Sequence, residues 1–253
     1  MMDTTRNAAK VPAVTLGFWV VKILATTLGE TGGDTVTMQL GLGYLVGTAI
    51  FLTLLVGFVA WQLAATRFRP ALYWATIIAS TTAGTTLADF ADRSLGIGYT
   101  GGGALLLALV LGTLAAWRWT LGSVDVATVR GPKAEAFYWA AITFSQTLGT
   151  ALGDWAADDG GLGFGGGALV FGAALAVLAA LYRFTRVSRV VLFWAAFILT
   201  RPLGATVGDL LDKPVADGGL AFSRALATAV LAGAIVLLLL VLPQRAAEAD
   251  SRH

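Results

Sequence analysis

Residues 18–34 read FWVVKILATTLGETGGD, and three later segments align with them without gaps. These segments are YWATIIASTTAGTTLAD (73–89), YWAAITFSQTLGTALGD (138–154) and FWAAFILTRPLGATVGD (193–209). Every copy has an aromatic–Trp pair, a Gly ten residues after the Trp and an Asp fifteen residues after it. The copies start 55, 65 and 55 residues apart. The chain is therefore built from four tandem repeats, and the longer central spacing divides them into two pairs.

Each repeat has room for two membrane-spanning helices, because a second apolar segment follows each aligned one. The chain of 253 residues is 57% hydrophobic and 13% charged, and its mean hydropathy is +0.77. A soluble domain carries about 25% charged residues, so a soluble globular enzyme is excluded. The apolar runs have the length of transmembrane helices. The predicted spans are 13–31, 42–64, 71–91, 99–119, 135–155, 164–183, 190–210 and 222–242.

These spans predict an all-α membrane protein made of four tandem helical hairpins. Since each repeat contains two spans, all four repeats enter the membrane in the same direction and are parallel repeats. The second helices are more uniformly apolar, so we expect the odd-numbered helices inside and the even-numbered helices outside. One transmembrane domain covers residues 1–253, with short tails at 1–12 and 244–253. The predicted repeats are 13–66, 70–120, 134–185 and 189–243. The sequence does not decide whether the four repeats form a ring around one axis or pack as two side-by-side halves. It also leaves the oligomeric state undecided.

Pairs of small residues four apart begin the second segment of each repeat. Small residues at this spacing lie on one helix face and allow another helix to approach closely, so we interpret them as a packing face. The pairs are Gly43/Gly47, Gly98/Gly102, Gly163/Gly167 and Ala221/Ala225.

The charged residues predict the orientation of the chain in a membrane. Twelve of the 17 basic residues fall on the side of the predicted tails. They are Arg6, Lys10, Arg67, Arg69, Arg118, Arg130, Lys133, Arg183, Arg186, Arg189, Arg245 and Arg252. The positive-inside rule then places both termini in the cytoplasm. Arg93, Lys213 and Arg224 lie near the other side, together with ten of the 15 acids. The lipid bilayer is the expected partner, and nucleic acid is not, because the basic residues do not cluster in a soluble domain.

The residue inventory excludes several kinds of chemistry. The chain has no Cys, and its single His is His253 in the polar tail. Thiolate metal sites, iron–sulfur clusters, bis-His haem and His-dependent triads are therefore excluded. No G-x-x-x-x-G-K-[ST] motif occurs, so the chain lacks a phosphate-binding loop for ATP hydrolysis. We predict no cofactor and no enzymatic activity, and any bound metal would need oxygen ligands.

Four tandem units with two spans and one Trp each resemble a bacterial family of membrane proteins defined by a "repeat of unknown function". The resemblance extends from Phe18 to about Leu242, and Trp19, Trp74, Trp139 and Trp194 correspond to the Trp that marks the family. Its members are mostly described as uncharacterised membrane-anchored proteins. The resemblance implies the architecture and a location in the bacterial inner membrane, and it implies no activity.

Polar residues recur at steps of four on the first helix of each repeat, which places them on one helix face. If the first helices form an inner bundle, these stripes meet in a central polar pathway. The predicted pathway residues are Lys22, Thr26, Glu30, Asp34, Thr81, Thr85, Asp89, Gln146, Thr150, Asp154, Arg201 and Asp209. Glu30 and Asp34 are the candidate metal ligands. The four repeat Asp residues are interpreted either as solvated helix ends or as an acidic ring that binds cations.

Two basic residues within the predicted spans have a more specific interpretation. A charge in the middle of a transmembrane helix costs about 2.5–3.5 kcal/mol on insertion scales, so it usually faces a partner or a cavity. Arg201 is predicted to pair with Glu30, next to a kink at Pro202. Lys22 either extends to the membrane surface or faces the pathway. The four repeat Trp residues are interpreted as an aromatic belt at the cytoplasmic interface.

The polar stripes favour a gradient-driven transporter or exporter of small cations, either a divalent metal or an organic amine. Glu30 or a neighbouring Asp would carry the proton in such a cycle. The alternative is a membrane scaffold or stress-response component that transports nothing. An intramembrane enzyme is a third interpretation, in which only carboxylates, Lys22 and hydroxyl groups would be available for chemistry.

Overall fold

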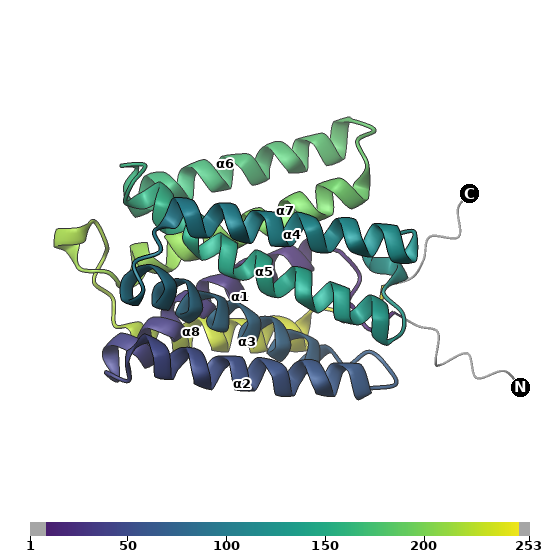
Figure 1. The fold of residues 1–253 in the computed structure, drawn as a ribbon, viewed down its shortest axis with the longest axis horizontal. Coiled ribbons are helices and arrows are strands. Elements are labelled where there is room, and N and C mark those ends of the chain that lie inside the picture. Colours follow the sequence, from purple (N-terminus) through teal and green to yellow (C-terminus); the bar gives the residue numbers. More distant parts are fainter. Residues whose placement is uncertain (1–8, 248–253) are drawn as a thin grey trace, which may run out of the picture.

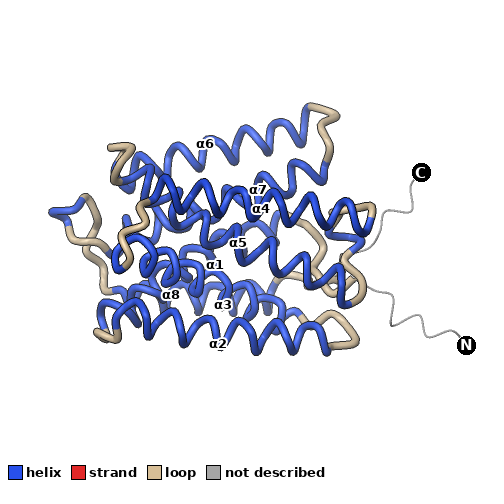
Figure 2. Tube along the Cα trace, viewed as in Figure 1, coloured by secondary structure: helices blue, strands red, loops and turns tan. Residues whose placement is uncertain are grey.

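A computed structural model describes residues 9–247 (Figure 1). Arg6, Arg252 and most of both predicted tails lie outside the described residues. Within them the chain is helical (Figure 2), and its one β-bridge pairs Pro12 with Ala246. The helices are α1 (Leu16–Asp34), α2 (Gly43–Ala64), α3 (Pro70–Asp89), α4 (Tyr99–Leu121), α5 (Pro132–Ala157), α6 (Gly163–Phe184), α7 (Arg189–Asp212) and α8 (Arg224–Val241). Short π or 3₁₀ turns form η2 (Thr35–Gln39), η3 (Phe90–Ser94), η4 (Val126–Thr128) and η5 (Val215–Asp217).

Five of these helices are long and apolar enough to cross a membrane. They are α2, α4, α6, α7 and α8. Of these, α7 buries 56% of its most apolar window inside the protein, whereas α8 buries 6%. The remaining long helices, α1, α3 and α5, carry the polar stripes on faces that the protein itself buries. The chain therefore has the composition and helix lengths of a membrane protein.

The first helices of the four repeats pack around a single axis. Helix α1 packs against α3 and α7, and α5 packs against the same two helices. This closes a ring in the order α1, α3, α5, α7. The arrangement answers the question that the sequence left open, because the repeats surround one axis and do not form two separate halves.

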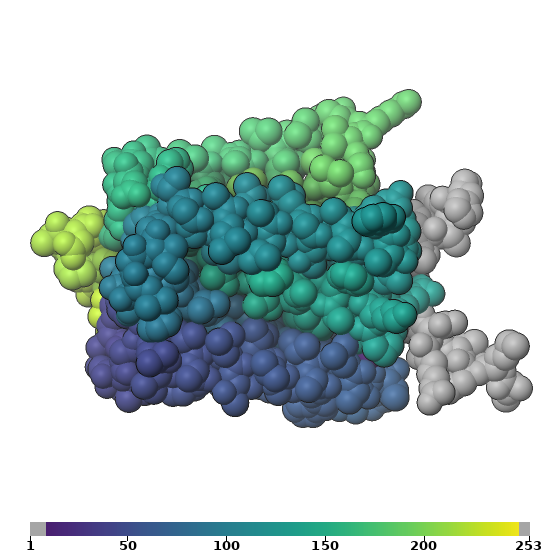
Figure 3. All heavy atoms as spheres, viewed as in Figure 1, coloured from purple at the N-terminus to yellow at the C-terminus, as the bar shows by residue number. Residues whose placement is uncertain are grey.

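Each second helix packs mainly against the first helix of the following repeat. Helix α2 packs on α3, α4 on α5 and α6 on α7, and α8 closes the circle by packing on α1. The predicted hairpins are thus not the main packing units, since α1 and α2 make little contact. The outer helices expose most of their apolar side chains, and α2 and α4 form much of the face shown in Figure 3. Contact between successive repeats is what joins the two layers.

The small residues that begin the second helices have two different roles. A Cβ atom added to Gly47 of α2 would lie 3.6 Å from the methyl of Thr86 on α3. A Cβ atom added to Gly167 of α6 would lie 2.8 Å from the methyl of Thr206 on α7. These two glycines belong to a packing face, as predicted. Gly43, in contrast, has a φ of +76° and meets no neighbouring atom within 4 Å, so it serves the turn into α2. Gly98 and Gly163 also have positive φ, so the packing-face interpretation is wrong for the first glycine of these pairs.

The two ends of the bundle differ. We call the end where Pro12 meets Ala246 the termini end, and the end with residues 35–42, 90–98, 158–162 and 213–223 the distal end (Figure 1). The basic residues of the connections 65–69, 122–131 and 185–188 lie at the termini end.

Candidate functional site

The polar stripes of α1, α3, α5 and α7 lie inside the ring. Positions 3, 7, 11 and 15 after each repeat Trp form four successive layers along the axis, because steps of four residues stay on one helix face. All twelve residues of the predicted pathway are at most 4% exposed. They are Lys22, Thr26, Glu30, Asp34, Thr81, Thr85, Asp89, Gln146, Thr150, Asp154, Arg201 and Asp209.

The repeat glycines bring these helices close together. Each one faces the residue seven positions after the Trp of the following repeat. The pairs run in cyclic order: Gly29 with Thr81, Gly84 with Gln146, Gly149 with Arg201 and Gly204 with Thr26. A Cβ atom at any of the four would come within 2.1–2.9 Å of its neighbour. Glycine is therefore required at these positions, and the close approach directs the polar side chains toward the axis.

Arg201 connects all four inner helices. Its Nη2 lies 3.0 Å from Oε2 of Glu30 on α1 and 2.5 Å from the hydroxyls of Thr85 on α3 and Thr150 on α5. The predicted pairing of Arg201 with Glu30 is thus confirmed, and neither side chain is more than 3% exposed. The Nε and Nη1 atoms of Arg201 have no hydrogen-bond partner in the protein. Helix α7 continues through Pro202 without interruption.

Lys22 lies one layer nearer the termini end and is fully buried. Its Nζ is 3.5 Å from Oε1 of Gln146 and 4.2 Å from the centroid of the Phe197 ring. The alternative in which Lys22 extends to the membrane surface is therefore wrong. Two cationic side chains, Lys22 and Arg201, instead occupy the interior of the ring.

The layer nearest the distal end consists of the four repeat aspartates. Asp34, Asp89, Asp154 and Asp209 are all buried, so the interpretation as solvated helix ends is wrong. Three of them pair with basic groups of the distal end. Lys213 lies 3.1 Å from Asp209 and also contacts Asp34, and Arg93 lies 2.9 Å from Asp89.

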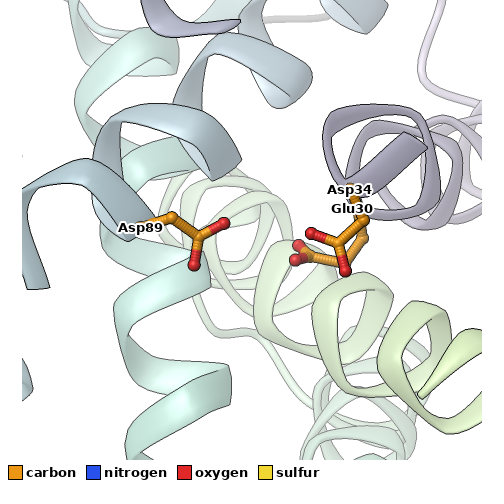
Figure 4. A group of neighbouring side chains, drawn as sticks. All are labelled: Glu30, Asp34 and Asp89. Carbon is orange, nitrogen blue, oxygen red and sulfur yellow. The ribbon is translucent and has the colours of Figure 1, made fainter. Parts of the chain in front are cut away.

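One group of carboxylates lies where α1 meets α3. One oxygen each from Glu30, Asp34 and Asp89 can be chosen so that all three lie within 4.8 Å of one another. Figure 4 shows Asp89 facing Glu30 and Asp34 across the space between their helices. Asp34, Asp209 and Asp212 form a second group of the same kind. Both groups offer only oxygen ligands, which suit magnesium, calcium or manganese.

Three residues at this end, Asp212, Lys213 and Arg224, are not among the pathway residues that the sequence predicts. The sequence does offer one signal, because Lys213 follows Asp209 by four residues. In the structure Arg224 lies 3.6 Å from Asp212 and 3.8 Å from Asp34. Burial acts to lower the pKa of Lys213, but the carboxylates of Asp209 and Asp34 outweigh it and raise that pKa well above its ordinary value. Lys213 thus pairs with two of the four repeat aspartates and closes the aspartate layer.

Comparison with known proteins identifies the repeat. The family described as Repeat of Unknown Function (DUF347) matches residues 17–68, 72–122, 137–188 and 192–245. The chain belongs to this family. No curated protein and no solved structure matches the chain. Membership establishes four tandem DUF347 repeats and assigns no activity to them.

The Trp of each DUF347 repeat contributes to an aromatic layer at the termini end of the polar stripes. Trp74, Trp139 and Trp194 are at most 5% exposed. They pack with Phe18, Tyr73, Tyr138 and Phe193, whose rings come from the position before each Trp. The hydroxyls of Tyr73 and Tyr138 share a hydrogen bond of 2.6 Å. The interpretation as an interfacial belt is therefore wrong for these three Trp residues, which close the axis of the DUF347 ring.

The segments that flank the four DUF347 repeats cover this aromatic layer. Ala9, Val11 and Ala247 are buried against it, and the backbone of Val11–Ala13 pairs with that of Arg245–Ala247. Lys10 lies 2.8 Å from Oε2 of Glu135 at the start of α5. The same ammonium donates hydrogen bonds to three carbonyl oxygens at the end of α2, at 2.7–3.2 Å.

Two clefts lie outside the DUF347 ring and contain none of the twelve pathway residues. The larger, about 620 Å³, lies between α1, α6 and α7 and has a mainly apolar lining that includes Trp19, Leu175 and Phe193. The other, about 580 Å³, lies between α4 and α5. The polar axis is covered at the termini end by aromatic rings and at the distal end by ion pairs.

Proposed function

We propose that the protein is a gradient-driven transporter of small cations, with its pathway along the polar axis of the four inner helices. All eight helices would cross the bacterial inner membrane, with the termini end in the cytoplasm. The 19 residues of α1 correspond to about 28 Å, close to the thickness of a bilayer core of about 30 Å. The basic connections at the termini end support this orientation by the positive-inside rule.

The observation that carries the proposal is the buried polar centre around Arg201. Each charge at such a depth costs about 2.5–3.5 kcal/mol on insertion scales, and apolar residues of the same volume would often be no less stable. Yet the axis retains Lys22, Arg201 and Glu30 with a lining of threonines. Polar atoms without a hydrogen-bond partner in the protein include Oγ1 of Thr81 and Nε2 of Gln146. Buried polar atoms nearly always have partners, so these atoms favour an axis that admits water or ions.

The closed ends define what transport requires. A cation from the distal side must displace the ion pairs of Lys213 and Arg224, and one from the termini side must pass the aromatic layer. Opening the two ends in alternation would move a cation without forming a continuous channel. The chain has no phosphate-binding loop, so an ion gradient would supply the energy.

Flux measurements on the full-length protein test this proposal. Proteoliposomes would be given Mn²⁺, Ca²⁺, Mg²⁺ or methylammonium, with an imposed pH gradient, a Na⁺ gradient or none. We expect gradient-dependent uptake of at least one cation, at least tenfold slower for Glu30→Gln and unchanged for Asp159→Asn, an exposed acid of the distal end. Thr150→Val, which changes no charge, provides a second variant of the axis. Absence of flux for all four cations under every gradient would refute transport.

The tight packing favours a second candidate function, a membrane scaffold. The four repeat glycines leave no room for a methyl group between the inner helices. A rigid ring of this kind could simply hold the outer helices in position for a partner. In that case the flux experiment gives no uptake, while variants of the outer faces of α2, α4, α6 or α8 affect the cell.

A further inference from the structure

We propose that Glu30, Asp34 and Asp89 form a binding site for one hard divalent cation, Ca²⁺ or Mn²⁺, that takes carboxylate ligands. This inference rests on the proposed function, for which it names the substrate. The three carboxylates come from two inner helices, α1 and α3, and lie around one space between them (Figure 4). All three side chains are at most 4% exposed, so the site is enclosed by protein.

The three oxygens lie close enough together to bind one ion. Calcium takes oxygen ligands at about 2.3–2.6 Å, so two ligand oxygens of one ion lie at most about 5 Å apart. The three oxygens of the site lie within 4.8 Å of one another, which satisfies this limit. Magnesium retains several water molecules and is usually bound by one or two carboxylates, so three enclosed protein carboxylates favour calcium over magnesium. Carboxylate ligands also suit manganese.

A second observation comes from the unpartnered oxygen of Asp34. Its Oδ2 contacts Lys213, whereas its Oδ1 is buried without a hydrogen-bond partner in the protein. A buried carboxylate oxygen without a donor is costly, and a bound cation removes that cost. In Glu30 and Asp89 the basic partner likewise contacts a single carboxylate oxygen, Oε2 of Glu30 for Arg201 and Oδ1 of Asp89 for Arg93. Each basic group thus orients a carboxylate and leaves its other oxygen for the cation.

The competing group of carboxylates, Asp34, Asp209 and Asp212, also lies close enough to share an ion and also has buried oxygens without a hydrogen-bond partner. Its basic groups, however, bridge its members. Lys213 contacts both Asp34 and Asp209, and Arg224 lies 3.6 Å from Asp212 and 3.8 Å from Asp34. A side chain that bridges two carboxylates takes the place of a shared metal ion, whereas Glu30 and Asp89 each pair with a separate arginine.

Differences between the repeats explain why the site forms only once. The residue four before the repeat Asp is Glu30 in the first repeat, but Thr85, Thr150 and Ala205 in the others. A carboxylate four residues before the repeat Asp therefore occurs only on α1. Asp154 is the equivalent residue of the third repeat, equally buried, and belongs to neither carboxylate group. It provides a control that is matched in sequence position and depth.

Mn²⁺ binding to the purified full-length protein tests the site. Electron paramagnetic resonance titration should show one saturable Mn²⁺ that Ca²⁺ displaces at lower concentration than Mg²⁺. Asp89→Asn and Asp34→Asn should each weaken binding at least tenfold, and Asp154→Asn should change it less than twofold. Size-exclusion profiles identify variants that fail to fold, and Asp89→Glu, which keeps the charge, should retain binding within about threefold.

Each outcome decides the inference. Absence of Mn²⁺ binding overturns the site, as does equal weakening by Asp89→Asn and Asp154→Asn. If methylammonium flux persists without Mn²⁺ binding, the transporter stands and the site falls. If Mn²⁺ binds as expected but no cation crosses the membrane, the site stands and transport falls.

Discussion

The guanidinium of Arg201 and the carboxylate of Glu30 lie 3.0 Å apart although 171 residues separate them in the chain. They come from the last and the first repeat, so their contact closes the ring of inner helices. Because both are fully surrounded by protein, the ion pair couples the position of α7 to that of α1. Removing one member leaves a buried charge without compensation.

We therefore expect Arg201→Met to destabilise the protein by about 3–5 kcal/mol, the usual cost of breaking a buried ion pair from one side. The double variant Arg201→Met/Glu30→Gln should lose less than the sum of the two single losses, by about 0.5–3 kcal/mol. Unfolding in detergent, followed by circular dichroism, measures all three variants. Additive losses would mean that the two side chains do not interact.

Replacing a glycine by alanine should destabilise the protein when the glycine lies between two inner helices, but not when it lies on an outer helix. In Gly149→Ala the new Cβ would lie 2.3 Å from Cγ of Arg201, so we expect a loss of about 1–3 kcal/mol from overpacking. Gly112 of α4 has no atom within 4 Å of an added Cβ, so Gly112→Ala is the matched control and should be neutral or slightly stabilising. Thermal unfolding distinguishes the two. Equal losses would contradict the close approach of α5 and α7.

Lys10 should hold the termini end closed. In Lys10→Met, Glu135 loses its ion pair and three carbonyls at the end of α2 lose a donor. The hydrogen-bonded backbone amides of Ala13 and Ala247 should therefore exchange with deuterium at least tenfold faster. Lys133→Met removes an exposed lysine from the first turn of α5, two residues before Glu135, and should leave that exchange unchanged. Unchanged exchange in Lys10→Met would show that the segment is held by its apolar contacts alone.

Much of this arrangement follows from the sequence, because repeats and four-residue steps record which faces turn inward. The pairing of Arg201 with Glu30 follows from the cost of isolated charges in a membrane. Three features do not follow. Helix α2 is mostly apolar, so little in its composition specifies α3 as its neighbour. Gly47 lies at this contact, but Gly43, which the sequence pairs with it, serves a turn instead. Trp74 is equally suited to an interface and to a buried aromatic layer. The contact of Lys213 with Asp34 depends on a loop whose path the repeats do not encode.

Lys213 should stabilise the distal end across the accessible pH range. Its pKa is raised above its ordinary value of about 10.4, so its ion pairs persist below that pH and are lost only as the pH rises through the higher folded-state pKa. Lys213→Met should therefore lower the stability by about 1–3 kcal/mol, and the loss should not diminish between pH 6 and pH 9. Melting temperatures at both pH values test this, with the exposed Arg67→Met as control. A loss that vanished at pH 9 would mean that the Lys213 ammonium deprotonates there.

The orientation of the chain can be tested directly, because the protein contains no cysteine. Ser94, at the distal end, and Ser188, at the termini end, are both exposed, and replacement by cysteine changes each side chain by a single atom. With the termini in the cytoplasm, a membrane-impermeant thiol reagent added to intact cells should label Ser94→Cys. Ser188→Cys should react only after the inner membrane is permeabilised, and both should react fully in detergent. The reverse pattern would place the basic connections outside the cell and the aspartate layer on the cytoplasmic side. A cation would then reach Lys213 first from the cytoplasm and not from outside.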